Sequence, residues 1–375
     1  MVSETFTQTG QLSLPIISIA PYLSQPSPEV ETRRASVSAA IHSACRDFGF
    51  FYLDISTISD PREPEELTEL ARKFFHSPQE EKDKLALSNQ DHARGYARLK
   101  ENVTNGKADN HEGIDFYCPV DNIDKTKPLW GENQWPIVPQ FKEKYEAWVG
   151  KMKMLGLIVM EAMAYGLGMT ADEWKELRGS VDDSFWVMRA IGYPPLPNDH
   201  DGFSCGAHKD YGCLTFLYAD PTLGALQVFL RRSSASPDLS GLPAEQGDEE
   251  GIWITADPIS GCVVCNIGES DALHFMGNYI PLGEIWSNGL YKSTLHRVIH
   301  KGSNYRIPFF FEPNFDALVT PLDAALRIQE KEKTTLLNEG KVEKVKEYKP
   351  IVYGKFLMGK VGNNFADGKG KYDDN

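Results

Sequence analysis

Apolar positions in the first half of the chain follow helical and extended patterns in turn. Between 30 and 48 they recur every three or four residues, and Gly49 interrupts this spacing just before the apolar run 50–53. The pattern predicts a helix with one buried face, followed by a strand. The longest helical pattern covers 141–168 and predicts a helix that braces the core along one side. Shorter patterns predict a strand at 14–20 and helices near 64–75 and 78–87.

The residues from 185 to 313 show a different pattern, short apolar runs bounded by glycine, proline and aspartate. We expect strands at 185–193, 214–218, 226–230, 253–254, 262–267 and 306–311. Short strands at this spacing are typical of a β-sandwich or jelly roll and not of βαβ units. The predicted fold class is therefore α+β with a mainly β core.

The remaining segments complete the predicted organisation. We divide the chain into an N-terminal region 1–180, a core 181–320 and a C-terminal helix and tail 321–375, which form one compact unit. Alternating charges over 323–347 predict a solvated surface helix. The apolar and aromatic segment 272–283 fits either a lid over a pocket or a surface Ω-loop.

Composition limits the class of protein and its partners. The 375 residues are 41% hydrophobic and 25% charged, enough to bury a sizeable core. The net charge of −14 argues against nucleic-acid binding, because a phosphate backbone would be repelled. With no basic leader and no apolar run of membrane-spanning length, we expect a cytoplasmic protein, a monomer or weak homo-oligomer, without a membrane partner. The six cysteines are too dispersed for a disulfide framework, and the pair Cys262 and Cys265 reads as part of a buried strand.

Two groups in the segment 206–216 (GAHKDYGCLTF) have the chemistry of metal ligands. His208 and Asp210 are two residues apart, so in an extended strand both side chains point to the same face. A third ligand candidate, His296, follows 88 positions after His208. Two histidines and one carboxylate suit a non-haem Fe(II) centre that keeps positions open for other ligands.

Six segments together resemble the isopenicillin-N-synthase-like branch of the 2-oxoglutarate/Fe(II) dioxygenases. They occur in the order of that family and read LPIISI (14–19), CRDFGFFY (45–52), GAHKDYG (206–212), GALQV (224–228), NIG (266–268) and WSNGLYKSTLHRV (286–298). The resemblance extends from about Leu14 to about Asn314, which is most of the chain.

This resemblance implies a fold, a set of cofactors and a reaction. The core would be a double-stranded β-helix that holds one Fe(II) through His208, Asp210 and His296. 2-Oxoglutarate would chelate the metal and be decarboxylated to succinate, with O2 as the oxidant and ascorbate as a candidate reductant. The substrate would be a small metabolite that loses a hydrogen atom, and the outcome would be hydroxylation, desaturation or oxidative cyclisation.

The segment 303–314 (SNYRIPFFFEPN) departs from the family, which usually has Arg-x-Ser here to bind the far carboxylate of 2-oxoglutarate. Counted forward from His296, Arg306 takes the arginine position and Pro308 the serine position. Counted back from the PFFFEPN block, Asn304 takes the arginine position and Arg306 the serine position. All three residues face the same way along a strand, so Arg306 points into the barrel in both registers. We therefore assign Arg306 to the co-substrate, with Asn304 beside it.

The resemblance also suggests further binding residues. Tyr193 matches a position where the family offers a hydroxyl to 2-oxoglutarate, and Tyr291 is a candidate for the same cavity. The N-terminal segment covers the barrel mouth in this branch, and its candidate substrate-binding residues are Arg94, Tyr96, Arg98, Asn102, Glu112 and Phe116.

Two other functions remain open on the sequence alone. The altered Arg-x-Ser motif is compatible with an Fe(II) oxidase of the isopenicillin N synthase type, which does not use 2-oxoglutarate. The same fold could also serve as a catalytically silent small-molecule binding module.

Overall fold

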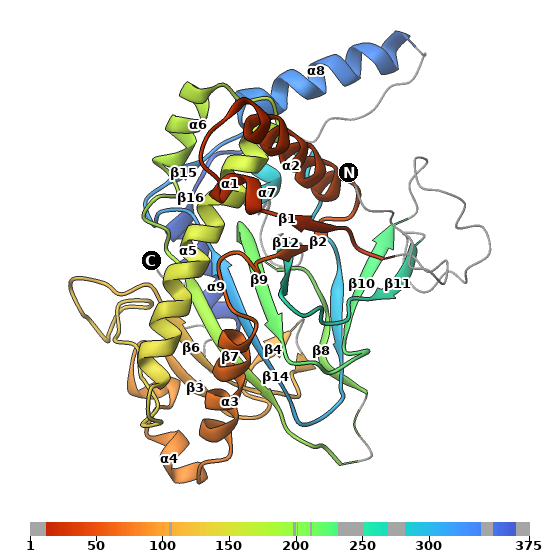
Figure 1. The fold of residues 1–375 in the computed structure, drawn as a ribbon. Helices are drawn as coiled ribbons and strands as arrows, with labels where there is room; N and C mark the ends of the chain where they lie inside the picture. The colour runs from red at the N-terminus through yellow and green to blue at the C-terminus, as the bar shows by residue number, and fades with distance from the viewer. Residues whose placement is uncertain are drawn as a thin grey trace.

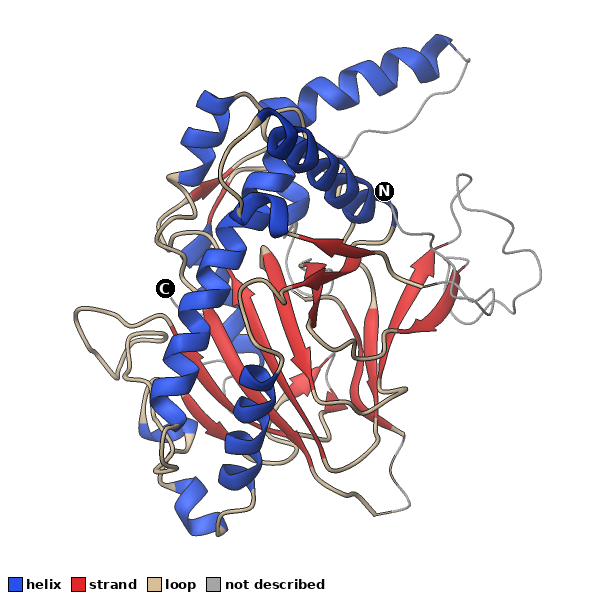
Figure 2. Ribbon diagram, in the orientation of Figure 1, coloured by secondary structure: helices blue, strands red, loops and turns tan. Residues whose placement is uncertain are grey.

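Two β-sheets form the centre of the protein, and three of the longer helices lie against the larger sheet (Figure 1). The structure is a computed structural model that describes residues 13–104, 107–197, 200, 202–210, 212–231, 251–268, 282–338 and 348–364. Figure 2 shows the separation of the two layers, with the long helices on one side and the strands on the other.

The larger sheet joins strands that are far apart in the sequence. Its eight strands run in the order β1 (Ile16–Ser18), β2 (Phe50–Asp54), β12 (Cys262–Ile267), β9 (Leu214–Ala219), β14 (Asn304–Phe311), β7 (Val187–Tyr193), β6 (Glu112–Tyr117) and β3 (Gly95–Ala97). The N-terminal strands therefore extend the core sheet at both edges. The expected mainly β core is confirmed.

The smaller sheet carries two of the candidate metal ligands. It contains β11 (Gly251–Thr255), β10 (Leu226–Arg231), β13 (His296–Ile299) and β8 (Phe203–His208), in that order. The strands β13 and β8 are antiparallel, and His296 pairs with His208 in their register. An apolar cluster that includes Tyr52, Val228 and Val264 fills the space between strands of the two sheets. Two further two-stranded sheets lie outside these sheets: the hairpin of β4 (Val103–Thr104) and β5 (Lys107–Ala108), and the pair of β15 (Leu318–Val319) and β16 (Ile351–Val352), which are distant in the sequence.

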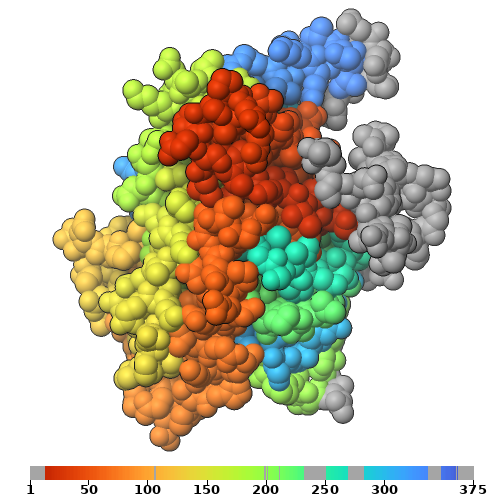
Figure 3. Space-filling view, in the orientation of Figure 1, coloured from red at the N-terminus to blue at the C-terminus, as the bar shows by residue number. Residues whose placement is uncertain are grey.

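The described helices are α1 (Ala20–Leu23), α2 (Pro28–Asp47), α3 (Arg62–Phe75), α4 (Gln79–Asp83), η1 (Leu87–Asn89), α5 (Phe141–Gly166), α6 (Ala171–Arg178), α7 (Leu282–Trp286), α8 (Asp323–Asn338) and α9 (Tyr353–Asn364). Of these, α2, α3 and α5 form a layer against the larger sheet. The contact of α5 with β14 is close at Gly156, where an added Cβ would lie 2.1 Å from the Phe311 ring. Figure 3 shows that α1 to α3, in red and orange, and α5, in yellow, cover much of this face.

Local sequence explains where the first long helix begins and ends. The Ser27 hydroxyl accepts a hydrogen bond from the Val30 amide at 3.2 Å, and Pro28 occupies the first turn. Gly49 follows the helix with φ of 65°, and an added Cβ would lie 2.0 Å from the Lys292 carbonyl oxygen. Only glycine fits this turn, which leads the chain directly into β2.

Several boundaries differ from the predicted ones. The helix predicted at 78–87 is limited to α4 and is followed by the separate turn η1. The helices α6 and α9 had no clear apolar pattern, because each is short or mixed in composition. Of the predicted lid segment 272–283, the structure describes only the last two residues, in α7, and the end of the predicted 323–347 helix also lies outside the described residues. None of the described helices is long and apolar enough to cross a membrane.

Candidate metal centre and active site

His208, Asp210 and His296 come together at one end of the smaller sheet. One potential ligand atom from each residue lies within 4.8 Å of the others. Asp210 Oδ1 is 3.6 Å from His208 Nε2 and 3.6 Å from His296 Nε2. The strand β8 ends at His208, so Asp210 is presented by the following turn and not, as the pattern predicts, by a continuous strand. The two side chains nevertheless converge.

Backbone carbonyls set the orientation of both imidazoles. His208 Nδ1 lies 2.8 Å from the Gly206 carbonyl oxygen, and His296 Nδ1 lies 3.2 Å from the Thr294 carbonyl oxygen. A carbonyl oxygen only accepts, so each Nδ1 carries the proton and each Nε2 presents a lone pair to the centre. Burial, together with His208, lowers the pKa of His296, which favours the neutral imidazole that a metal ligand requires.

Two side chains from the larger sheet hold the Asp210 carboxylate. Its Oδ2 accepts hydrogen bonds from Thr215 Oγ1 and from Asn266 Nδ2, each at 2.8 Å. Oδ1 is then the oxygen that faces both imidazoles. Burial opposes ionisation of Asp210, but the two histidines hold its pKa well below the ordinary value. The sequence analysis missed both supporting residues, although Asn266 lies in one of the six segments that carry the family resemblance.

The turn after Asp210 is shaped by a buried acid. The Glu312 carboxylate accepts a hydrogen bond from the Cys213 amide at 3.0 Å. Gly212 has φ of 120°, and a Cβ there would lie 1.9 Å from Glu312 Oε1. Burial raises the pKa of Glu312 well above its ordinary value, and Asp210 adds to this effect. Burial and Asp210 therefore both disfavour a second negative charge beside the turn that Glu312 supports.

Arg306 is a buried cation that faces a pocket. The pocket lies between the two sheets and includes Tyr52, Leu217, Thr222, Leu226 and Arg306 in its lining. Arg306 is 4% exposed, and its guanidinium lies 5.6 Å from the centre of the Tyr193 ring. Among the described residues, no carboxylate lies within ion-pair distance of it. A buried guanidinium in this position suits the bidentate binding of a carboxylate ligand.

The other predicted co-substrate residues have different surroundings. Asn304 does not line the pocket, but it is buried and both atoms of its side-chain amide lack a hydrogen-bond partner among the described residues. Tyr193 is buried beside Arg306 and also contacts the edge of His111, with ring centres 5.9 Å apart. Tyr291 lies elsewhere, because its hydroxyl is 3.0 Å from His42 Nδ1 and 3.4 Å from the Met163 carbonyl oxygen. The structure therefore brings Tyr193, but not Tyr291, to Arg306.

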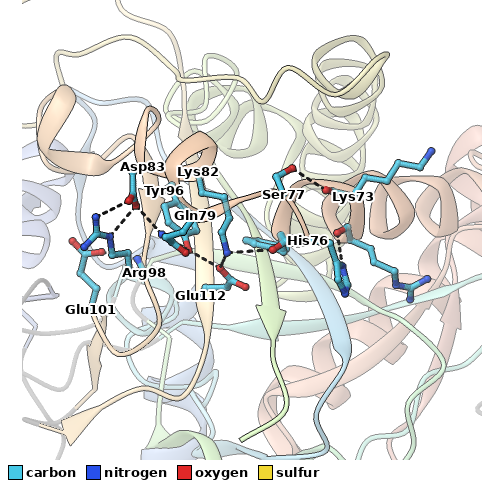
Figure 4. A network of polar contacts seen from close by, with 12 residues as sticks. Lys73, His76, Ser77, Gln79, Lys82, Asp83, Tyr96, Arg98, Glu101 and Glu112 are labelled. Atoms are coloured by element: carbon cyan, nitrogen blue, oxygen red, sulfur yellow. Dashed lines mark hydrogen bonds and ion pairs between the residues drawn. The ribbon is translucent and has the colours of Figure 1, made fainter.

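In the described part of the chain, four of the six predicted substrate residues, Tyr96, Arg98, Glu112 and Phe116, make their polar and aromatic contacts with other residues of the N-terminal half and not with the metal ligands or Arg306. Figure 4 shows two of these contacts: Glu112 bonds both Tyr96, at 2.6 Å, and Lys82, at 2.7 Å, while Arg98 pairs with Asp83. Phe116 stacks on Trp135, with ring centres 4.2 Å apart.

The remaining two residues differ from each other. Arg94 is fully buried in an ion pair with Asp91 at 2.6 Å, so its guanidinium is held by the protein itself. Asn102 lies nearer the metal ligands, because its amide is 2.9 Å from His111 Nε2 and His111 contacts Tyr193. Of the six, Asn102 is thus the one that these contacts connect to the residues around Arg306.

A second set of polar residues beside His208 was not predicted. The hairpin β4–β5 lies next to β8, and the Asn110 amide donates a 2.9 Å hydrogen bond to the Ser204 carbonyl. Cys205 Sγ is 3.5 Å from His208 Nδ1 and 3.6 Å from Thr104 Oγ1. Thr104 in turn donates a 2.8 Å hydrogen bond to the buried Asp109. Because these contacts join segments about 100 residues apart, no local pattern signals them.

Family models match both halves of the chain. Residues 14–137 match the N-terminal model of non-haem dioxygenases in morphine synthesis, and residues 183–313 match the 2OG-Fe(II) oxygenase superfamily. The chain is 37% identical over 370 residues to homoarginine-6-hydroxylase 2-ODD-C23 of Glycine max, covering 95% of this chain and 98% of that protein. A second homoarginine-6-hydroxylase, 2-ODD-233 of Oryza sativa subsp. japonica, is 35% identical, with 94% and 98% covered.

Solved structures give the same fold. Neurospora crassa T7H in complex with alpha-KG superposes with a TM-score of 0.71 at 24% identity, covering 97% of this chain and 99% of that chain. The expected jelly roll is thus confirmed, and neither the oxidase alternative nor the silent module is favoured. The nitrogen and oxygen donors of the His-Asp-His group also suit Fe(II). The chain therefore belongs to the 2OG-Fe(II) oxygenase superfamily, as an oxidoreductase that uses Fe(II) and 2-oxoglutarate.

Proposed function

We propose that this enzyme hydroxylates a small basic amino acid of the homoarginine class at an Fe(II) centre held by His208, Asp210 and His296. The observation that carries the proposal is the convergence of two imidazole Nε2 atoms on one oxygen of Asp210. The likeness to homoarginine-6-hydroxylases along nearly the whole chain supports the substrate class.

The side chains around the metal ligands would keep the donor set in place. Thr215 and Asn266 occupy Asp210 Oδ2, which leaves Oδ1 for the metal. The edge of the Phe50 ring packs against His296, with ring centres 5.1 Å apart, and this contact limits both rotation of the imidazole and access of water. When bound, Fe(II) with 2-oxoglutarate and O2 supplies the oxidising power, and succinate and CO2 are released with the hydroxylated substrate.

Arg306 would bind the far carboxylate of 2-oxoglutarate. The absence of a carboxylate partner among the described residues supports this role, because a buried guanidinium is costly without one. Tyr193, beside Arg306, would contribute its hydroxyl, and the unsatisfied amide of Asn304 would complete the polar end of the site. The serine of the usual Arg-x-Ser motif would then not be needed.

The two halves of the chain would bind different ligands. Residues 181–320 would hold the metal and 2-oxoglutarate, whereas residues 1–180 would supply the wall that contacts the substrate.

We also propose that the enzyme acts in the cytoplasm as a monomer or weak homo-oligomer on a free small molecule, without nucleic acid. Light scattering at several protein concentrations tests the oligomeric state.

Turnover of a defined panel of amino acids tests the proposed reaction. The enzyme is supplied with Fe(II), ascorbate, 2-oxoglutarate and O2, together with homoarginine, arginine, lysine or the uncharged analogue homocitrulline. We expect a basic amino acid to stimulate succinate release and to gain one oxygen atom in equal amount, as mass spectrometry would show. If no basic amino acid stimulates succinate release or gains oxygen, the proposed substrate class is wrong. Substrate oxidation without any need for 2-oxoglutarate would favour the oxidase alternative.

A further inference from the structure

Asp109 differs from the other buried acids in the N-terminal half of the described chain. Three of these acids pair with a lysine or arginine: Asp91 with Arg94 at 2.6 Å, Glu112 with Lys82 at 2.7 Å and Asp115 with Arg189 at 2.7 Å. Asp109 is 6% exposed, yet no described lysine or arginine forms an ion pair with it. A buried carboxylate without a cationic partner is costly, which calls for an explanation.

The position of Asp109 is fixed by the protein. Its amide donates a 2.9 Å hydrogen bond to the Asn102 carbonyl, and its Oδ2 accepts one from Thr104 Oγ1 at 2.8 Å. Thr104 Oγ1 is in turn 3.6 Å from Cys205 Sγ. These contacts orient the side chain but carry no full positive charge. Burial raises the pKa of Asp109, and His208 and Arg189 oppose this rise only in part.

The carboxylate is also close to the metal ligands. Cys205 Sγ is 3.5 Å from His208 Nδ1. Two side chains, Thr104 and Cys205, therefore link Asp109 to a proposed metal ligand. Asp109 belongs to the N-terminal segment beside β8, whereas Arg306 belongs to β14 in the other sheet. The site thus combines a cation on β14 with a buried carboxyl group on the N-terminal wall that has no ion pair with a described lysine or arginine.

We infer that Asp109 binds the cationic group of the substrate, a guanidinium or an ammonium group. This inference rests on the proposed function and assigns a specificity-determining residue to it. In homoarginine, carbon 6 carries the guanidinium, so an anion that holds this cation near the metal would also present that carbon for hydroxylation. Asp109 has the burial and the location for this role, and an ion pair with the substrate cation would stabilise the ionised form of its carboxyl group.

Equilibrium binding without turnover tests the role of Asp109. The probes are homoarginine and homocitrulline, which share their length and shape but differ in charge. Each is titrated by calorimetry into protein that carries Mn(II) and 2-oxoglutarate under anaerobic conditions. The test variant is Asp109→Asn, because an asparagine keeps the size and still accepts the Thr104 hydrogen bond.

A matched control removes a similar carboxylate elsewhere. Asp124 lies on the loop before α5 and accepts a 2.6 Å hydrogen bond from Thr126 Oγ1, much as Asp109 does from Thr104. Asp124→Asn therefore removes the same charge and alters the same type of contact outside the site. Circular dichroism of both variants reports whether the fold is retained.

The binding ratio decides between the outcomes. We expect the wild type to prefer homoarginine over homocitrulline by roughly 30-fold or more, the size typical of a buried charge-assisted contact. Asp109→Asn should bring the ratio close to one, whereas Asp124→Asn should leave it unchanged. If Asp109→Asn keeps the wild-type preference, the inference is wrong and the proposed function stands. If the wild type does not bind homoarginine and the turnover panel shows no oxidation of any basic amino acid, both are overturned.

Discussion

Asn266 Nδ2 donates a 2.8 Å hydrogen bond to Asp210 Oδ2, and this contact decides which carboxylate oxygen faces the two histidines. The two residues lie 56 positions apart, on β12 and on the turn after β8. Thr215, on β9, donates a second hydrogen bond to the same carboxylate oxygen. The metal centre of the smaller sheet is therefore aligned by side chains of the larger one.

Removing the Asn266 amide should weaken metal binding more than it weakens the fold. In Asn266→Ala the carboxylate keeps only the Thr215 contact and gains freedom to rotate, so we expect metal affinity to fall about 10- to 100-fold. Anaerobic titration with Mn(II) measures this change. Asn89→Ala is a suitable control, because the Asn89 amide donates to backbone carbonyls of Asp83 and Lys84. Equal affinities in Asn266→Ala and the wild type would contradict the alignment role.

Replacing Arg306 should affect 2-oxoglutarate and spare the amino-acid substrate. Arg306→Ala removes the proposed bidentate partner, and we expect the half-saturating 2-oxoglutarate concentration to rise by about 100-fold. Arg306→Lys keeps the charge but not the planar fork, so its effect should be intermediate. Steady-state kinetics with each ligand varied in turn separates the two effects. A similar rise for both ligands would indicate a general disturbance of the site instead.

Gly212 is expected to tolerate no side chain. A Cβ at this position would overlap Glu312 Oε1, and the φ of 120° is unfavourable for any other residue. Gly212→Ala should therefore lower the free energy of unfolding by about 2 kcal/mol or more. Gly150→Ala provides the contrast, because nothing lies within 4 Å of its added Cβ and it sits inside α5. Denaturant unfolding of the metal-free proteins measures both changes, and equal stabilities would refute the proposed clash.

Buried His111 should make the protein sensitive to acid. Burial lowers the pKa of His111 from 6.5 to about 3, and Arg189 adds to this effect. The unfolded chain binds a proton near pH 6.5 and the folded protein only near pH 3, so stability is full above pH 6.5 and declines between these values. The imidazole accounts for a slope of up to about 1.4 kcal/mol per pH unit.

The variant His111→Gln tests this dependence. The slope of unfolding free energy against pH should become shallower than in the wild type, whatever the change in absolute stability. His76→Gln is the control, because His76 is exposed. If both variants keep the wild-type slope, His111 does not account for the acid sensitivity.

Much of the fold could be predicted because its signals are local. The spacing of apolar residues indicated α2, α3 and α5, and the short apolar runs indicated β7, β9, β10, β12 and β14. The convergence of His208, Asp210 and His296 was harder to predict, since 88 residues separate the two histidines. The family resemblance joined them, and the structure brings their ligand atoms together.

The wall of the site could not be predicted, because its contacts depend on segments that are distant in sequence. Arg94 resembled a substrate-binding residue on a strand, whereas the structure pairs it with Asp91. The spacing of three residues between them was a usable signal for that pair. Asp109 offered no such signal, because its position beside β8 depends on how the β4–β5 hairpin packs. Tyr291 was misplaced because irregular chain separates it from β13.

Anaerobic visible spectroscopy tests the central claim most directly. Fe(II) is added to the metal-free protein, followed by 2-oxoglutarate, in the wild type and in the Asp210→Ala and His296→Ala variants. The account predicts a metal-to-ligand charge-transfer band in the wild type after 2-oxoglutarate is added, and its loss in both variants although circular dichroism shows an intact fold. A band of undiminished intensity in both variants would contradict the assignment of His208, Asp210 and His296 as the metal centre.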